Sequence, residues 1–203
     1  MKDDTSTKRK AIYLDRDGTL IKLVYDQITN HIDSVSKKEE VEITYDFPEV
    51  LKKLKQLGYL LIIISNQPRI GLKKETKENF EEIHQEMVKQ LENERIKLDK
   101  IYYCFHHPFA EVEEYRIKCE CRKPGIKFFK DAENEFKIDL SKSYMIGDSA
   151  NDVKAGYAAG VKTILFANIE EAAYLELLEK QLGSIKPDYL IKEPKQILEI
   201  IND

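Results

Sequence analysis

The chain has 203 residues, of which 42% are hydrophobic and 34% are charged, and its formal net charge is -4. This composition favours one α/β domain with an ordinary core, and the negative charge argues against a general nucleic-acid-binding protein. No apolar run reaches the length of a membrane span, and the residues before Lys10 contain no apolar signal region. We therefore expect a cytoplasmic monomer with a flexible tail at residues 1–9 and a single domain over residues 10–203.

Apolar runs alternate with helical patterns along the chain. The predicted strands cover residues 11–15, 59–64, 101–103, 144–147, 161–166 and 188–191. The predicted helices cover residues 46–57, 74–95, 125–136, the stretch from Asp148 to Ala159, 170–181 and 195–201. Residues 16–45 show no long period, and we interpret them as a flap. The alternation predicts a three-layered, Rossmann-like α/β fold with a parallel sheet and helices on both faces.

Three helices carry clear local signals. Asp46-Phe47-Pro48-Glu49 predicts a helix start with Asp46 as N-cap, and Gly58 predicts its end. The predicted buried positions follow helical spacing: Val50, Leu51, Leu54 and Leu57 on the first helix, Phe80, Ile83, Met87 and Leu91 on the second, and Phe128, Phe129, Ala132 and Phe136 on the third.

The stretch Asp15-Arg16-Asp17-Gly18-Thr19 directly follows the first predicted strand. In an open α/β sheet, ligands bind beyond the carboxyl ends of the strands, where Asp15 and Asp17 would lie. Strand alternation points residues i and i+2 the same way, so these carboxylates would repel each other without a cation between them. A hard cation such as Mg²⁺ is the simplest partner. The alternative is that Asp-Arg-Asp-Gly is only a turn.

Two further strands end in polar residues suited to phosphate. The second strand continues into Ser65, whose hydroxyl can bond a phosphate oxygen, and the fourth is followed by Asp148. Between them lies Lys123, which can neutralise a phosphate or keep a carboxylate ionised. Each of these residues taken alone could equally be an ordinary turn or solvated loop residue. Together they predict a phosphate site at the strand ends.

This set of motifs resembles the haloacid dehalogenase superfamily, in the branch of phosphatases that use an aspartate nucleophile. The resemblance covers residues 11–166, and Pro187 to Ile201 fits the usual final strand and helix. The matching positions are Asp15 to Thr19 for the first motif, Ser65 for the second, Lys123 for the third, and Gly147-Asp148 with Asp152 for the fourth.

The resemblance also implies roles for these residues. Asp15 would attack phosphorus and form an aspartyl-phosphate, while Asp17 would protonate the leaving oxygen and then activate water. Mg²⁺ would be held by the Asp15 side chain, the Asp17 backbone carbonyl and the Asp148 side chain. Asp152 would lie behind these ligands, and Ser65 and Lys123 would contact the phosphoryl group.

All three cysteines lie within residues 104–121, a segment that we call the zinc loop. Cys104, His106, Cys119 and Cys121 supply three thiolates and one imidazole, which make a complete tetrahedral shell for a structural Zn²⁺. An odd number of cysteines does not resemble a disulfide framework. The alternative is three ordinary buried thiols, but the charged neighbours of Cys121 do not resemble an apolar core.

The pattern Cys-x-His, a twelve-residue spacer and Cys-x-Cys-Arg-Lys-Pro resembles the heptose 1,7-bisphosphate phosphatase family. The resemblance implies that Arg122, Lys123, Asn66 and Gln67 bind a phosphorylated sugar, that the 7-phosphate is cleaved, and that no large cap domain is present. Lys22, Lys37, Lys38 and Arg69 are candidates to hold the second phosphate.

Two alternatives stay open. Histidinol-phosphate phosphatases carry a related loop with a shorter spacer. The other alternative is a catalytically inactive fold whose zinc loop is a protein-interaction module, although such a module has no need for Asp15, Asp17, Lys123 and Asp148 together.

Overall fold

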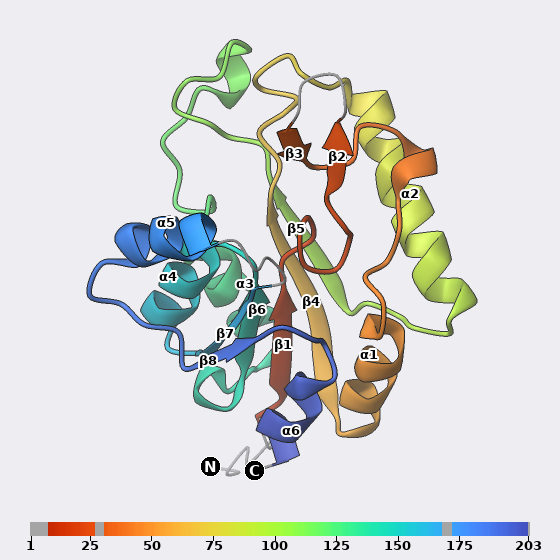
Figure 1. Ribbon diagram of the computed structural model, residues 1–203, viewed down its shortest axis with the longest axis vertical. Coiled ribbons are helices and arrows are strands. Elements are labelled where there is room, and N and C mark those ends of the chain that lie inside the picture. The colour runs from red at the N-terminus through yellow and green to blue at the C-terminus, as the bar shows by residue number, and fades with distance from the viewer. Residues whose placement is uncertain (1–7, 27–30, 168–171, 203) are drawn as a thin grey trace, which may run out of the picture.

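The computed structural model describes residues 8–26, 31–167 and 172–202 of the chain. A central sheet of six parallel strands runs through it in the order β5-β4-β1-β6-β7-β8 (Figure 1). The strands are β1 (Lys10–Leu14), β4 (Tyr59–Asn66), β5 (Lys100–Cys104), β6 (Tyr144–Gly147), β7 (Lys162–Phe166) and β8 (Tyr189–Ile191). The sheet confirms the predicted parallel α/β fold.

Strand β1 lies between β4 and β6, and all three strands end at the same edge of the sheet. Leu14 pairs with Ile63 on one side and with Ile146 on the other. The N–H of Asp15 donates to the carbonyl oxygen of Ile146 at 2.9 Å. The residues that follow these strands therefore start from neighbouring points at the carboxyl edge of the sheet.

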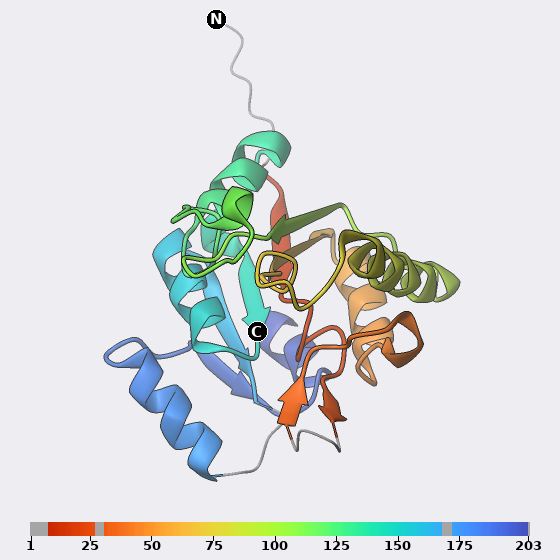
Figure 2. The same cartoon turned by 90° about the horizontal axis from the view of Figure 1, so that it is seen from above.

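Helices cover both faces of the sheet, because alternate strand residues are apolar on both sides. The helices are α1 (Phe47–Gln56), α2 (Lys77–Asn93), α3 (Lys127–Phe136), α4 (Ala150–Ala159), α5 (Ala172–Leu182) and α6 (Gln196–Asn202). Ile12 and Leu14 pack in one core cluster with side chains from α1, α2 and α6, whereas Ala11 and Tyr13 pack on the opposite face with α3 and α4. Figure 2 shows α1 and α2 on one side of the sheet and α3 and α4 on the other.

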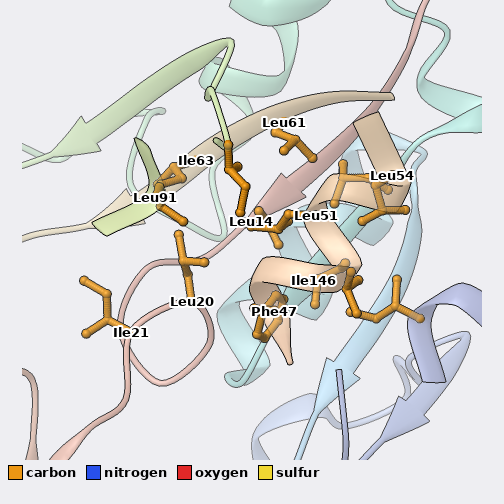
Figure 3. Close-up of a cluster of buried hydrophobic side chains, with 14 of the residues drawn as sticks. Leu14, Leu20, Ile21, Phe47, Leu51, Leu54, Leu61, Ile63, Leu91 and Ile146 are labelled. Carbon is orange, nitrogen blue, oxygen red and sulfur yellow. The ribbon is translucent and has the colours of Figure 1, made fainter. Parts of the chain in front are cut away.

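The first core cluster lies between the sheet and helices α1 and α2. Figure 3 shows Leu14, Leu61, Ile63 and Ile146 from the strands beside Leu51 from α1. These side chains are fully buried, and burying one such aliphatic side chain contributes about 1.5–3 kcal/mol. This packing makes the edge of the sheet a rigid support for the residues beyond it.

The predicted flap at residues 16–45 contains a small second sheet in which β2 (Val24–Asp26) pairs with β3 (His31–Asp33) in antiparallel fashion. It lies above the carboxyl end of β1 (Figure 1). Arg69, in the segment after β4, pairs with Asp33 at 2.8 Å and connects the two parts. The strands contain only three residues each, which is too short for a period to be detected from sequence.

Several local predictions need correction. Asp46 stands at the N-cap position of α1, but it has φ of 67°, makes no capping hydrogen bond and instead pairs with Lys195 at 3.1 Å. Leu57, predicted to be buried, is 42% exposed because α1 ends at Gln56 and the chain leaves the helical spacing there. Helix α2 begins later than predicted because the Thr76 hydroxyl caps it, accepting from the N–H of Asn79 at 3.1 Å.

The prediction of buried side chains is confirmed fully on α2 and only in part on α3. On α2, the four predicted side chains are all buried. On α3, Phe129 and Ala132 are buried, while Phe128 and Phe136 are only partly covered.

Most of the predicted tail, residues 1–7, lies outside the described residues. Within the described part of the chain, no helix combines the length and apolarity needed to span a membrane.

Candidate active site

Three carboxylates gather at the carboxyl ends of β1 and β6. Asp15, Asp148 and Asp152 each offer an oxygen, and these oxygens lie within 4.8 Å of one another. Asp15 and Asp148 were predicted here from their strand ends. Asp152, predicted to lie behind the ligands, has an oxygen in the same group, and its carboxylate also contacts Lys123 and Ser149.

Asp152 reaches this group because α4 begins immediately after β6. It is the third residue of α4, and its Oδ2 accepts from the N–H and the hydroxyl of Ser149 at 3.0 Å and 2.6 Å. This reciprocal capping arrangement fixes the first turn of the helix. A Cβ on Gly147 would lie 2.3 Å from Cγ of Asp152, so only glycine allows the helix to approach so closely.

Lys123 lies among these carboxylates and is almost fully buried. Its Nζ is 2.8 Å from Oδ1 of Asp15 and 2.5 Å from Oδ1 of Asp152, and it donates to the carbonyl oxygen of Ile64 at 2.7 Å. Burial works against the charged ammonium, but Asp15 and Asp152 together raise the pKa of Lys123 above its ordinary value. The lysine therefore stays charged and compensates part of the negative charge.

The group of Asp15, Asp148 and Asp152 has three carboxyl groups and only one ammonium, that of Lys123, among them. Burial raises the pKa of Asp148 well above its usual range, and Asp15 and Asp152 raise it further. Burial also raises the pKa of Asp15, although Lys123 opposes that shift. Buried carboxylates that face one another favour a bound cation, and carboxylate oxygens are the ligands that Mg²⁺ prefers. The donor set therefore fits a hard divalent cation.

The loop after β1 approaches Asp148 closely. Gly18 has φ of +76°, and a Cβ there would lie 2.1 Å from Oδ2 of Asp148. Glycine is required at this point for two reasons, the left-handed backbone and the lack of space. The close approach brings the first-motif loop against the fourth-motif aspartate.

The Asp17 carboxylate points to a different set of partners. Arg16 donates to it through Nε at 3.1 Å and 3.2 Å and through Nη2 at 3.0 Å. Nε2 of Gln67 donates to Oδ2 of Asp17 at 2.6 Å and to Oγ of Ser65 at 3.0 Å. The predicted residues Asp17, Ser65 and Gln67 thus form one hydrogen-bonded group beside the three carboxylates.

Sequence reasoning assigned no role to Arg16, which lies at the centre of this second group. Arg16 follows β1 and contacts the side chain of the adjacent Asp17, so strand alternation gave no signal for this role. A buried arginine then needs an acidic partner, and Asp17 is that partner.

Asn66 lies next to Ser65, and its amide binds the backbone of Lys123. It accepts from the N–H of Lys123 at 2.9 Å and donates to the carbonyl oxygen of Lys123 at 3.1 Å. The position of the lysine therefore depends on the end of β4. Asn66 and Gln67 were both predicted to bind substrate, and in the structure their amides bind protein groups.

The four predicted zinc ligands lie together. Cys104, His106, Cys119 and Cys121 each place one ligand atom within 4.8 Å of the other three. The sulfur–sulfur distances are 3.6 Å for Cys104 and Cys119, 3.3 Å for Cys104 and Cys121, and 3.2 Å for Cys119 and Cys121. Ligands at about 2.3 Å from zinc would be about 3.8 Å apart in a tetrahedron. The cluster is therefore compatible with a zinc site.

Burial raises the pKa of the Cys104 and Cys121 thiols, so the three thiols of the cluster differ in how readily they ionise. Burial opposes ionisation of Cys119, but hydrogen bonds from Cys121 and the Arg122 backbone lower the pKa of that thiol to about 7. The thiolate is the form that binds metal. Nδ1 of His106 is 3.4 Å from the sulfur of Cys121 and faces into the cluster.

The predicted basic residues around the site are spread over several segments. Arg122 is half-buried and donates from Nη1 to the carbonyl oxygen of His106 at 3.3 Å. Lys22 pairs with Glu42, and Lys38 pairs with Glu82 at 3.1 Å, both on the surface. Arg69 is the more enclosed candidate, because its side chain is 18% exposed where it pairs with Asp33.

Comparison with known proteins identifies the family. The D-glycero-beta-D-manno-heptose-1,7-bisphosphate 7-phosphatase of Escherichia coli O6:H1 is 37% identical over 153 residues, which cover 75% of this chain and 76% of that protein. The chain belongs to this family of HAD-like phosphatases. A member from Haemophilus ducreyi with the same name is 32% identical over 96% of this chain and 99% of its own length. The HAD-hydrolase-like family profile matches residues 120–193.

A solved structure shares the fold of this chain. The D,D-heptose 1,7-bisphosphate phosphatase from B. bronchiseptica, complexed with magnesium and phosphate, has a TM-score of 0.73 and 22% sequence identity. The match covers 94% of this chain and 99% of that one. The relatives confirm the predicted family, and the solved structure confirms the predicted fold.

Proposed function

We propose that this protein is a Mg²⁺-dependent phosphatase that hydrolyses a sugar phosphate monoester through an aspartyl-phosphate on Asp15. The observation that carries the proposal is the buried group at the strand ends, in which Lys123 contacts both Asp15 and Asp152. The family relationship supports the same reaction class. Phosphoryl transfer needs positioning and charge neutralisation more than other catalytic devices, and this group supplies both.

In the first step, an oxygen of Asp15 forms a bond to phosphorus while the bond from phosphorus to the sugar oxygen breaks. Lys123 keeps Asp15 ionised and neutralises charge on the phosphoryl oxygens. Asp17 donates a proton to the leaving oxygen, which departs as an alcohol. Ser65 contributes a hydroxyl to the phosphoryl oxygens.

In the second step, Asp17 accepts a proton from water as the water oxygen attacks phosphorus. The bond between phosphorus and Asp15 breaks, inorganic phosphate leaves, and both aspartates return to their starting forms. Asp15 and Asp148, with the backbone carbonyl of Asp17 and with Asp152 adjacent, would hold Mg²⁺, which when bound neutralises phosphoryl charge. The excess of negative charge in this group is the reason that a cation fits.

We propose that the zinc loop carries a structural Zn²⁺ on Cys104, His106, Cys119 and Cys121. Four protein ligands leave no open coordination position, so such an ion orders the loop and does not take part in chemistry. Arg122 and Lys123 directly follow the last ligand. An ordered loop would therefore place Arg122 at the rim, where its planar fork suits a pair of phosphate oxygens.

The proposed substrate is D-glycero-D-manno-heptose 1,7-bisphosphate, cleaved at the 7-phosphate. The names of the relatives at 32% and 37% identity support it. Arg69 and Arg122 are the enclosed cations that we propose for the second phosphate. Histidinol phosphate is the alternative substrate. A zinc-loop interaction module without catalysis is disfavoured, because such a module gains nothing from a buried lysine shared by two aspartates.

The test is a comparison of kcat/KM for heptose 1,7-bisphosphate, histidinol phosphate, fructose 1,6-bisphosphate and p-nitrophenyl phosphate, with and without Mg²⁺. We expect heptose 1,7-bisphosphate to be preferred and turnover to require Mg²⁺. A preference for histidinol phosphate by tenfold or more, about 1.4 kcal/mol, would contradict the heptose assignment. Absence of phosphate release from every substrate would contradict the enzymatic proposal itself.

A further inference from the structure

Arg16 is the largest fully buried side chain in the described part of the chain, with 1% of its surface exposed. It lies in the loop at the carboxyl end of β1, between Asp15 and Asp17. Burying a guanidinium is unfavourable unless its charge is paired and its N–H groups are bonded. The partners of Arg16 therefore indicate why the protein keeps it there.

Arg16 holds the Asp17 carboxylate with parallel hydrogen bonds. Nε donates to Oδ1 at 3.1 Å and Nη2 donates to Oδ2 at 3.0 Å. Nη2 also donates to Oε1 of Gln67 at 2.9 Å, and Nε2 of Gln67 donates back to Oδ2 of Asp17 at 2.6 Å. The carboxylate thus receives donors from two segments, the loop after β1 and the segment after β4.

The guanidinium itself is fixed by two aromatic rings. The ring centroids of Phe80, from α2, and Tyr103, from β5, lie 5.4 Å and 5.8 Å from Cζ of Arg16. The hydroxyl of Tyr103 is in turn 2.9 Å from Nδ1 of His84 on α2. Because this surrounding is packed and hydrogen-bonded, Arg16 has little freedom to turn away from Asp17.

This arrangement separates Asp17 from the other carboxylates. Among the described residues, Asp15, Asp148 and Asp152 form one group that could hold a metal ion, and the Asp17 side chain is not part of it. A free carboxylate at position 17 would be drawn to a cation bound by that group, because Mg²⁺ prefers carboxylate oxygens. A carboxylate bound to the cation could no longer exchange a proton with substrate or water.

We propose that Arg16 is a positioning residue, which together with Gln67 holds the Asp17 carboxylate in the place where it exchanges protons. This inference rests on the proposed function, since the role of Asp17 is part of that function. The planar fork of Arg16 sets the plane of the carboxylate, which the single ammonium of a lysine cannot do. A displacement of about 1 Å at a reacting group can reduce the rate about 100-fold.

The experiment is a double-mutant cycle with wild type, Arg16→Lys, Asp17→Asn and the double variant. Arg16→Lys keeps the buried charge and removes the fork. We expect kcat to fall roughly 10- to 100-fold while KM changes less than about threefold. In the Asp17→Asn background, Arg16→Lys should cause almost no further loss, because Arg16 acts through Asp17. Gln67→Leu removes the second donor from a different segment and provides a separate route if Arg16→Lys does not fold.

Two further measurements separate positioning from a general structural role. With p-nitrophenyl phosphate, whose leaving group departs without a proton, Arg16→Lys should show a larger initial burst of p-nitrophenolate than wild type. The burst would arise because attack of water on the aspartyl-phosphate still needs the Asp17 base. Mg²⁺ affinity, measured by calorimetry, should be unchanged or higher.

Independent losses that multiply in the double variant would overturn the inference. So would a fall in Mg²⁺ affinity that matches the fall in kcat, because it would show that Arg16 supports the whole site. In both of these results the wild type is active, so the proposed function stands. A wild type that releases no phosphate would overturn the proposed function and this inference with it.

Discussion

Lys123 and Asn66 bind each other through two hydrogen bonds although they lie 57 positions apart. The N–H of Lys123 donates to Oδ1 of Asn66 at 2.9 Å, and Nδ2 of Asn66 donates to the carbonyl oxygen of Lys123 at 3.1 Å. These bonds connect the end of β4 to the segment after the zinc loop. They fix the backbone from which the lysine side chain reaches Asp15.

Replacing Asn66 by Leu should therefore impair activity by displacing Lys123. The substitution leaves the N–H and the carbonyl of Lys123 without their partner, and we expect the free energy of unfolding to fall by about 1–3 kcal/mol. We also expect kcat/KM for phosphate release to fall at least roughly tenfold. Asn79→Leu is a matched control, because Asn79 also donates to a backbone carbonyl, that of Ser36, but on the surface. Wild-type kcat/KM in folded Asn66→Leu would refute this role.

Substitution of the two first-motif aspartates should stop the reaction at different stages. Asp15→Asn lacks the charge to attack phosphorus, so turnover should fall on the order of 10⁴-fold or more while the fold persists. Asp17→Asn should instead slow both steps and accumulate the aspartyl-phosphate, because its proton carrier is lost. Acid-quenched protein examined by mass spectrometry would show the phosphoryl group. The mechanism is falsified if folded Asp15→Asn keeps near-wild-type activity.

The purified protein should contain about one zinc per chain. Cys119→Ser should lose most of this metal and lower the melting temperature, because three ligands hold zinc less well and the loop is then less constrained. Metal analysis and thermal unfolding are the measurements. Phe109→Ser, in the same loop and 82% exposed, is the control that should retain zinc. Freshly purified wild type without zinc would show that the four side chains serve another purpose.

Two glycine substitutions should separate backbone strain from the close approach to Asp148. Gly18 and Gly58 both have positive φ, +76° and +84°, but only at Gly18 would a Cβ meet Asp148. Gly58→Ala should reduce the free energy of unfolding by about 1–3 kcal/mol through strain and keep kcat. Gly18→Ala should cost at least as much and also reduce Mg²⁺ affinity and kcat, because Asp148 must move. Equal kcat in the two folded variants would contradict the proposed importance of this contact.

The stability of the protein should decrease at mildly acidic pH, partly through His84. Burial lowers the pKa of His84, and Arg16 lowers it further, although Glu81 opposes the shift. Around its ordinary pKa of about 6.5, the unfolded chain binds a proton that the folded chain does not. The His84 contribution is therefore complete above that pH and is lost as pH falls through the lower folded pKa.

Urea unfolding at several pH values between about 5 and 8 measures this contribution. His84→Gln should flatten the pH dependence relative to wild type. The assignment to His84 would be wrong if the wild type and His84→Gln showed parallel pH profiles.

Local sequence patterns predicted the main sheet, the helices around it and most of the chemistry at the strand ends, but not the short strands β2 and β3. Strand and helix periods are local, so the buried face of α2 could be predicted from neighbouring residues. The chemical character of a side chain is also present in the sequence. Carboxylates after buried strands indicate a cation site, and three cysteines with a histidine indicate zinc, before any contact is known.

The packed fold decides which of these residues meet. The strand order places β1 between β4 and β6, and this brings Lys123 to Asp15 across 108 positions. No local period encodes that pairing. For the same reason, no role was predicted for Arg16, because the position of its side chain also depends on Gln67, Phe80 and Tyr103 from other segments.

Polar side chains such as those of Asp46 and Asn66 can bind several partners, and the partner seen in the structure comes from a distant segment. Asp46 had the residue type of an N-cap, but its carboxylate pairs with Lys195 of a distant segment. The role of Asn66 in substrate binding stays a prediction, and in the structure its amide binds the Lys123 backbone. A polar side chain binds whichever partner the packed fold brings within reach. Its sequence neighbours show what it can bind, and the fold decides what it does bind.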